Sequence, residues 1–133
     1  YQQLGFKLVV DPSVNYSGYF DARSRSITMK QIDDSVYHEL GHFLAFIAGN
    51  VDKTASFQSI FAAEKANVTA FNKAYVTQNA SEYFAESVKD YILNNASLKS
   101  SRPQTYAAVQ NALNQITDAQ IAKIQKIYGA FWN

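Results

Sequence analysis

His38-Glu39-Leu40-Gly41-His42 is the stretch that decides the fold of this 133-residue chain, and it uses both histidines of the sequence. On an α-helix, residues four apart lie on one face a turn apart, so His38 and His42 can bind a single metal ion. Glu39 would lie beside that face, where a carboxylate can take a proton from a metal-held water. The motif therefore predicts a zinc-dependent hydrolase, most often a peptidase.

The residues around the motif have the pattern of a buried helix. Asp33 and Asp34 are candidates for its N-cap, and Gly49-Asn50 is typical of a helix end. Between these two points apolar residues recur at helical spacing, at Val36, Leu40, Phe43, Leu44 and Ile47. We therefore expect a buried helix that carries two histidines on its remaining face.

The composition argues against several classes of protein. The net charge is +1 and the basic residues are scattered singly, so we expect neither a nucleic-acid partner nor a polybasic membrane anchor. No apolar run approaches the ~20 residues of a transmembrane helix. The chain has no cysteine, which removes disulfides, cysteine–zinc sites and thiol nucleophiles. Any metal must therefore be held by His, Asp or Glu.

The length of the chain fits one domain, 1–133, which we expect to be monomeric. Residues 1–49 would supply strands and the motif helix, and residues 50–133 would be helical. The start at Tyr1, without an initiator Met or a signal segment, indicates a mature form or a domain of a longer precursor. Four glycosylation sequons are read as ordinary polar surface, at Asn15, Asn67, Asn79 and Asn95.

Strand patterns come before the motif and helical patterns after it. Residues 6–10 predict a strand, and residues 16–30 predict two strands around a polar turn. Helical spacing follows in 53–74 (one long or two short helices), 81–94, 103–115 and a last helix that begins with a capping box, Thr117 to Gln120. The predicted class is α+β: a small N-terminal β-rich part packed on the motif helix, followed by an all-helical C-terminal part.

A third metal ligand must come from a carboxylate, because catalytic zinc usually takes three protein ligands and leaves the fourth position to water. Among four Glu and seven Asp, Glu82 and Glu86 stand out because they are four apart on a predicted helix. Like charges at this spacing destabilise a helix unless a cation intervenes. Zinc bound by Glu82, with Glu86 orienting a ligand histidine, would supply that cation. Alternatively, Asn79 and Glu82 form a capping box and Glu86 pairs with Lys89, and spacing alone leaves both interpretations open.

The order of these residues resembles the anthrax lethal factor-type metallopeptidase domain, a group that includes the secreted Pro-Pro endopeptidases of Gram-positive bacteria. The shared pattern is HELGH followed by a Tyr and then, seven residues later, Glu-Tyr-Phe-Ala-Glu at 82–86. It covers residues from about 5 to 95 in order and spacing.

The resemblance implies a zincin-like fold, secretion, and a Zn²⁺ ion as cofactor. It implies that His38, His42 and Glu82 are the zinc ligands. Glu39 would then be the general base, Tyr75 would stabilise the oxyanion, and Glu86 would orient a ligand histidine.

We expect a zinc-dependent endopeptidase that acts on peptides or proteins docked in extended form along an edge strand at Ser26–Met29. Tyr16, Tyr19 and Phe20 either line a subsite or pack in the core, and we expect the core. One alternative is a catalytically inactive zincin-fold module for binding or toxin docking, although ligands, base and tyrosine are all present. Another is a structural zinc site, but such sites are normally closed by four ligands, and no third His or Cys exists.

Overall fold

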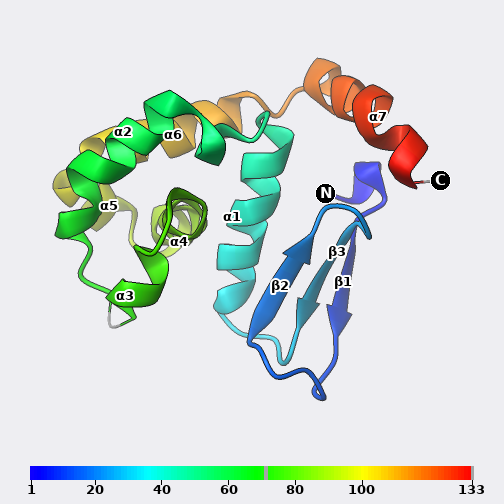
Figure 1. The fold of residues 1–133 in the computed structure, drawn as a ribbon, viewed down its shortest axis with the longest axis horizontal. Coiled ribbons are helices and arrows are strands. Elements are labelled where there is room, and N and C mark those ends of the chain that lie inside the picture. Colours follow the sequence, from blue (N-terminus) through cyan, green and yellow to red (C-terminus); the bar gives the residue numbers. More distant parts are fainter. Residues whose placement is uncertain (71, 133) are drawn as a thin grey trace.

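The computed structural model of the chain describes residues 1–70 and 72–132 and has a mixed α+β architecture. A three-stranded sheet from the N-terminal part lies on one side of the long helix α1 (Ser35–Ile47), and most of the other helices lie on its far side (Figure 1). The predicted α+β class, with strands first and a helical remainder, is therefore confirmed. Within the described residues, no helix is both long and apolar enough to cross a membrane.

The sheet has the strand order β1 (Lys7–Val10), β3 (Ser26–Met29), β2 (Gly18–Asp21). β1 pairs parallel with β3, and β2 pairs antiparallel with β3. The prediction of an edge strand at Ser26–Met29 is therefore wrong, because β3 is the central strand. A parallel pairing between distant segments leaves no hairpin signal in the sequence, so the position of β1 could not be read from it. The edge strand beside α1 is β2.

One face of the sheet packs against α1. Ile27 and Met29 of β3 are buried on this face. Phe20 of β2 belongs to the same packing, because its ring lies 6.3 Å from the ring of Phe43 in α1. The apolar residues of the second and third strands therefore fix the sheet on the motif helix.

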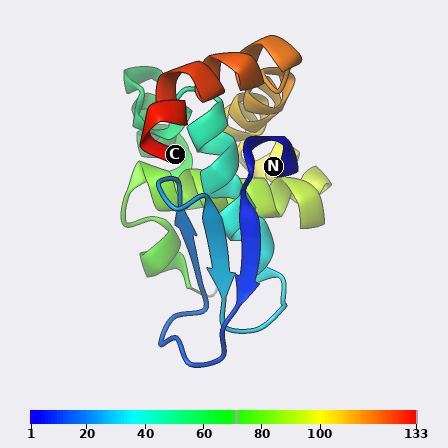
Figure 2. The ribbon, with the colours of Figure 1, turned by 90° about the vertical axis from the view of Figure 1, so that its right-hand side faces the viewer.

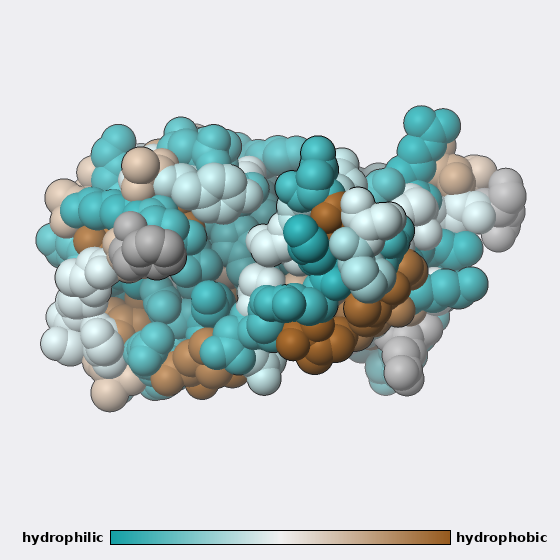
Figure 3. Space-filling model, turned by 90° about the horizontal axis from the view of Figure 1, so that it is seen from below, coloured by the Kyte–Doolittle hydropathy of each residue, from teal (hydrophilic) through white to brown (hydrophobic). Residues whose placement is uncertain are grey.

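The other edge strand, β1, is more exposed to solvent. The three apolar residues of β1 are 48%, 42% and 49% exposed, at Leu8, Val9 and Val10. Hydrophobic surface accordingly gathers over the sheet half of the molecule in the view from below (Figure 3). Tyr16 and Tyr19 are also exposed, with ring centroids 5.9 Å apart, so the expectation of a packed core is correct for Phe20 only.

Helix α1 begins and ends where the sequence predicts. The carboxylate of Asp33 accepts a hydrogen bond from the Ser35 backbone N–H at 2.9 Å, whereas Asp34, at the N-cap itself, makes no side-chain cap bond. At the other end Gly49 has a φ of +76°, and its N–H donates to the Phe46 carbonyl at 3.3 Å. A glycine in this left-handed conformation stops the helix.

The helical remainder contains six further helices among the described residues: α2 (Ala55–Glu64), α3 (Lys73–Val76), α4 (Ala80–Leu93), α5 (Asn95–Ser101), α6 (Pro103–Asn114) and α7 (Asp118–Trp132). Short 3-10 helices lie at Gln2–Leu4, Val51–Lys53 and Lys65–Asn67. The segment 53–74 therefore holds two short helices, with position 71 outside the described residues. Helix α5 was not predicted, because its polar sequence has no clear apolar spacing.

Helix α7 returns to the sheet, so the two ends of the chain lie near each other (Figure 2). The Trp132 indole N–H donates to the Ala22 carbonyl at 2.9 Å. At the start of the helix, Thr117 Oγ1 accepts from the Gln120 N–H at 3.1 Å, which is one half of the predicted capping box. The Gln120 side chain donates instead to the Ile47 carbonyl at 2.7 Å. Helix α7 is thus tied to α1 at one end and to the sheet at the other.

Candidate active site

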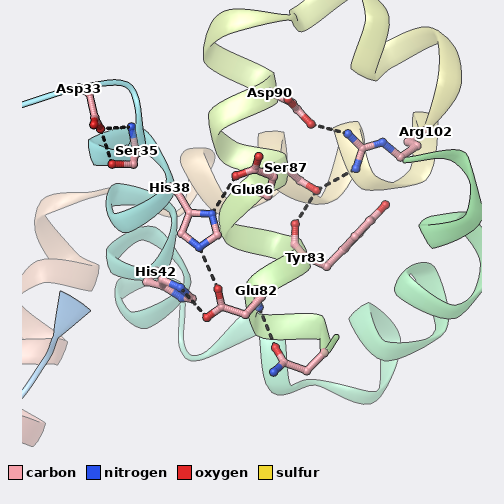
Figure 4. A network of polar contacts seen from close by, with 11 residues as sticks. Asp33, Ser35, His38, His42, Glu82, Tyr83, Glu86, Ser87, Asp90 and Arg102 are labelled. Carbon is pink, nitrogen blue, oxygen red and sulfur yellow. Dashed lines mark hydrogen bonds and ion pairs between the residues drawn. The ribbon is translucent and has the colours of Figure 1, made fainter. Parts of the chain in front are cut away.

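The two histidines of the motif lie side by side on α1, as their spacing predicts. Their ring centroids are 5.0 Å apart, and both imidazoles face helix α4 (Figure 4). His38 is only 7% exposed. The packing of α4 against α1 encloses this pair of rings.

Glu82 comes to the histidines from the first turn of α4. Its backbone N–H donates to the Asn79 side chain at 2.8 Å, which caps the helix. Its carboxylate oxygens lie 2.9 Å from His38 Nε2 and 3.2 Å from His42 Nε2. The Asn79 cap that the sequence suggested is thus present, and the Glu82 carboxylate bridges the two imidazoles.

Glu86, one turn further along α4, holds the other nitrogen of His38. Its Oε1 lies 2.9 Å from His38 Nδ1, so each ring nitrogen of His38 faces a carboxylate. Burial opposes protonation of His38, but the hydrogen bonds to Glu82 and Glu86 outweigh it and raise the His38 pKa to about 9. Burial likewise opposes ionisation of Glu82, but its hydrogen bonds to the two histidines hold its pKa far below the ordinary value. In the metal-free protein the cluster is therefore an ionised pair around a protonated imidazole.

The donor set of this cluster suits zinc. One ligand atom from each of His38, His42 and Glu82 can be chosen so that all three lie within 4.8 Å of one another. Donor atoms around a tetrahedral zinc ion are about 3.3 Å apart, given Zn–N and Zn–O distances near 2.0 Å. His38 Nε2 lies 2.9 Å from one oxygen of Glu82 and His42 Nε2 lies 3.2 Å from the other, so the three side chains converge and could hold one ion. The Glu86 contact would orient the His38 ring, as carboxylates commonly do for zinc-bound histidines.

Glu39 is buried against the edge strand β2 and is only 7% exposed. Burial raises its pKa, and neighbouring positive charge on the two histidines only partly opposes that rise. The backbone N–H of Phe20 also acts to lower this pKa, because the carboxylate lies beside β2. Gly18 makes room for it, because a Cβ there would lie 3.0 Å from Glu39 Cγ and 3.1 Å from its Oε2.

Tyr75 reaches the cluster from the short helix α3. Its ring centroid lies 6.3 Å from that of His38, and its hydroxyl is close enough to Glu82 for that carboxylate to affect its pKa. Burial and the negative charge of Glu82 raise the Tyr75 pKa to about 12. The phenol is therefore protonated at neutral pH and available as a hydrogen-bond donor.

A cavity of about 290 Å³ opens over these groups. His38, Glu39, Tyr75 and Glu86 all contribute to its wall, together with Gly18 at the start of β2. A ligand in this one space can therefore reach Glu39, His38 and Tyr75.

The side of α4 that faces away from the histidines is fixed by buried polar contacts (Figure 4). The Arg102 guanidinium donates to Ser87 Oγ at 3.2 Å and to Asp90 Oδ2 at 2.6 Å. The Tyr83 hydroxyl lies 2.6 Å from Thr105 Oγ1. Because these residues alternate with Glu82 and Glu86 along the helix, they set the rotation of α4 that presents both carboxylates to α1.

Glu64 of α2 joins the same network of polar contacts and fixes the start of α6. Glu64 is 5% exposed and accepts hydrogen bonds from the Thr105 backbone N–H at 2.8 Å, the Thr105 hydroxyl at 2.7 Å and the Gln104 N–H at 3.1 Å. A carboxylate at a helix start satisfies N–H groups that have no partner within the helix. Glu64 is therefore a buried residue that fixes the start of α6.

The structure brings together all six residues singled out from the sequence: His38, Glu39, His42, Tyr75, Glu82 and Glu86. The sequence interpretation missed the part played by Gly18 in making room for Glu39. A glycine inside a strand pattern often marks a close approach by another group, and that signal was available at Gly18.

Two comparisons with known proteins found sequences similar to this chain. The family model described as "Anthrax toxin lethal factor, N- and C-terminal domain" matches residues 19–112, which is more than half of the chain. A Pro-Pro endopeptidase of Clostridioides difficile (strain 630) is 41% identical over 78 residues, which are 56% of this chain and 34% of the relative. The matched region thus spans about a third of that relative's length. On the match of the family model, the chain belongs to the anthrax toxin lethal factor family.

Proposed function

We propose that the chain is a zinc-dependent endopeptidase with a zincin-like fold. The observation that carries this proposal is the position of Glu39, a buried carboxylate beside the three donor groups of His38, His42 and Glu82. A structural zinc site would not require an acid of raised pKa in the wall of an open cavity. The family and the name of the relative support the same reaction class.

In the proposed site, His38, His42 and Glu82 hold the zinc ion, with Glu86 orienting His38. When bound, zinc supplies Lewis acidity that lowers the pKa of a water molecule and polarises the scissile carbonyl. Glu39 takes the proton of the attacking water and passes it to the amide nitrogen as the C–N bond breaks. Its burial favours this role, because a raised pKa lets a carboxyl group hold the proton between the two steps.

Tyr75 is proposed as the donor to the oxyanion. Negative charge grows on the carbonyl oxygen as water attacks, and a protonated phenol can stabilise it by a hydrogen bond. The pKa of about 12 keeps the proton on Tyr75 throughout the working pH range. The Glu82 contact of Tyr75 in the metal-free site would then be exchanged for the substrate oxygen.

We propose that the substrate peptide adds to the free edge of β2. Among the described residues β2 pairs only with β3, and its residues Gly18 and Phe20 border Glu39. An antiparallel peptide strand is the more stable arrangement at such an edge. Methylation of the peptide backbone nitrogens beside the scissile bond should therefore raise KM, and an unchanged KM would contradict docking by strand addition.

The substrate sequence is the next quantity to measure. The relative's name makes a peptide with a Pro-Pro bond the first one to test. We propose a mixed peptide library beside it, incubated with zinc-loaded protein, with protein treated with a zinc chelator, and with protein to which zinc is returned. Cleavage that disappears on chelation and returns with zinc supports the proposal. Zinc binding without cleavage of any peptide would favour a binding module in its place. Secretion and a monomeric state are further proposals, which rest on the family resemblance.

A further inference from the structure

A second cavity of about 430 Å³ adjoins the catalytic cavity. Three residues line both spaces, namely Asn72, Glu86 and Lys89. A peptide bound beside Glu39 can therefore place a neighbouring side chain in this second cavity. Its volume leaves ample room for one amino-acid side chain.

The wall of this cavity is polar. Beyond the three shared residues, its described lining carries mainly amide and hydroxyl groups, at Asn67, Thr69, Asn94, Ser97 and Ser101. The other two charged residues of the wall form an ion pair, with Arg102 Nη2 2.6 Å from Asp90 Oδ2, so their charges largely cancel. A proline or leucine side chain would cover hydrogen-bonding groups here without replacing their bonds to water, which costs free energy.

The mouth of the cavity offers one acceptor and one donor. Glu86 and Lys89 are three residues apart on α4, so they lie on one face of the helix. Glu86 uses its Oε1 to hold His38, and its other oxygen has no hydrogen bond among the described residues. None of the ion pairs among the described residues involves Lys89. A carboxylate residue and an ammonium residue therefore both line the boundary that the two cavities share.

We propose that this cavity is a specificity subsite for a carboxamide side chain, Asn or Gln, of the peptide substrate. A carboxamide carries a donor for Glu86 and an acceptor for Lys89 on the same planar group. A substrate carboxylate would be repelled by the carboxylate of Glu86, and a substrate ammonium or guanidinium would be repelled by the ammonium of Lys89. The inference rests on the proposed peptidase function and names the substrate class of that site.

The test is a position-scanning peptide library, read as kcat/KM for each residue at each position. At one position of the peptide, kcat/KM should be about tenfold or more higher for Asn and Gln than for Leu, Pro, Asp and Lys, because a site built for hydrogen bonds rejects analogues that lack them. Lys89→Glu leaves two carboxylates at the cavity mouth and should move the preference to Lys and Arg. Lys123→Glu, on the exposed face of α7, is the matched control and should keep the wild-type preference.

A binding measurement separates the two proposals. Zinc-loaded Glu39→Gln protein should bind a peptide with Gln at that position about tenfold more tightly than the same peptide with Leu or Glu, because only the carboxamide pairs with both groups of the subsite. Cleavage by the wild type without an Asn or Gln preference, or with a preference that Lys89→Glu leaves unchanged, would overturn the subsite and leave the peptidase intact. Absence of any cleavage together with absence of any binding preference would overturn both.

Discussion

Gly41 of α1 lies directly against the backbone of Ala85 in α4. A Cβ atom at Gly41 would lie 2.6 Å from the Ala85 carbonyl oxygen and 2.7 Å from its Cα. Real Cβ atoms do not approach backbone this closely, so only glycine permits the two helices to pack at this distance. Ala85 stands between Glu82 and Glu86, and the close approach is what brings both carboxylates within hydrogen-bonding distance of His38.

Replacing Gly41 with Ala should push α4 away from α1. We expect the free energy of unfolding to fall by about 1–3 kcal/mol, as in other overpacked cores. Zinc affinity should fall with it, because Glu82 and Glu86 move together with the helix. Gly129→Ala, at a helical glycine with open space around its Cα, is the matched control and should be neutral or slightly stabilising. Equal melting temperatures and zinc dissociation constants for Gly41→Ala and wild type would contradict this explanation of the site.

Gly18→Ala tests the position of the proposed base. The added Cβ would lie 2.9 Å from Met29 Sδ and 3.0 Å from Glu39 Cγ, so one of these side chains must move. We expect kcat to fall about tenfold or more, since small displacements of a catalytic group are costly. The zinc content should stay at the wild-type value, because Gly18 touches no zinc-binding side chain among its nearest neighbours. Steady-state kinetics with metal analysis measures both, and an unchanged kcat would show that Glu39 tolerates the shift.

Glu86→Gln tests the orientation of His38. The amide keeps the shape of the side chain but loses the charge that holds the imidazole through Nδ1. Loss of such a partner typically weakens zinc binding by about 10–100-fold. Competition with a chelator of known affinity gives the dissociation constant. A value equal to that of the wild type would mean that Glu86 is not needed to position the ligand.

The metal-free protein should lose stability as the pH rises above neutral. The His38 pKa lies at 6.5 in its ordinary state and at about 9 in the folded protein. Because the folded value is raised, this group's contribution is fully present below pH 6.5 and is lost as the pH rises through about 9. Melting temperatures of chelator-treated protein should therefore fall across this window. His38→Gln should remove most of the slope, and a flat wild-type profile would contradict the ionised cluster.

Much of the site could be predicted from the sequence because its strongest signals are local. The spacing of His38 and His42 and the caps around α1 depend only on neighbouring residues. The spacing of two like charges made Glu82 a candidate, and the family resemblance then favoured it as a ligand over a residue of a capping box. The resemblance to a family then singled out Tyr75, which is otherwise one of nine tyrosines.

What the sequence did not reveal depends on contacts between distant segments. Because β1 pairs with β3, the strand Ser26–Met29 is central, and the edge strand beside α1 is Gly18–Asp21. No local sequence pattern encodes the pairing of β1 with β3. The burial of Glu64 under α6 was missed for the same reason. The assignment of 1–133 as a single domain, the roles of the individual site residues and the monomeric state stay predictions.

The most direct measurement compares turnover by the wild type and by Glu39→Gln on the best peptide from the library, at equal zinc content. Glutamine preserves the size of the side chain but cannot take the proton of the attacking water. We predict that Glu39→Gln binds zinc and peptide like the wild type and loses at least about 10²-fold in kcat, the lower end of the range for general-base catalysis. Wild-type turnover by a zinc-loaded Glu39→Gln protein would contradict the proposed mechanism.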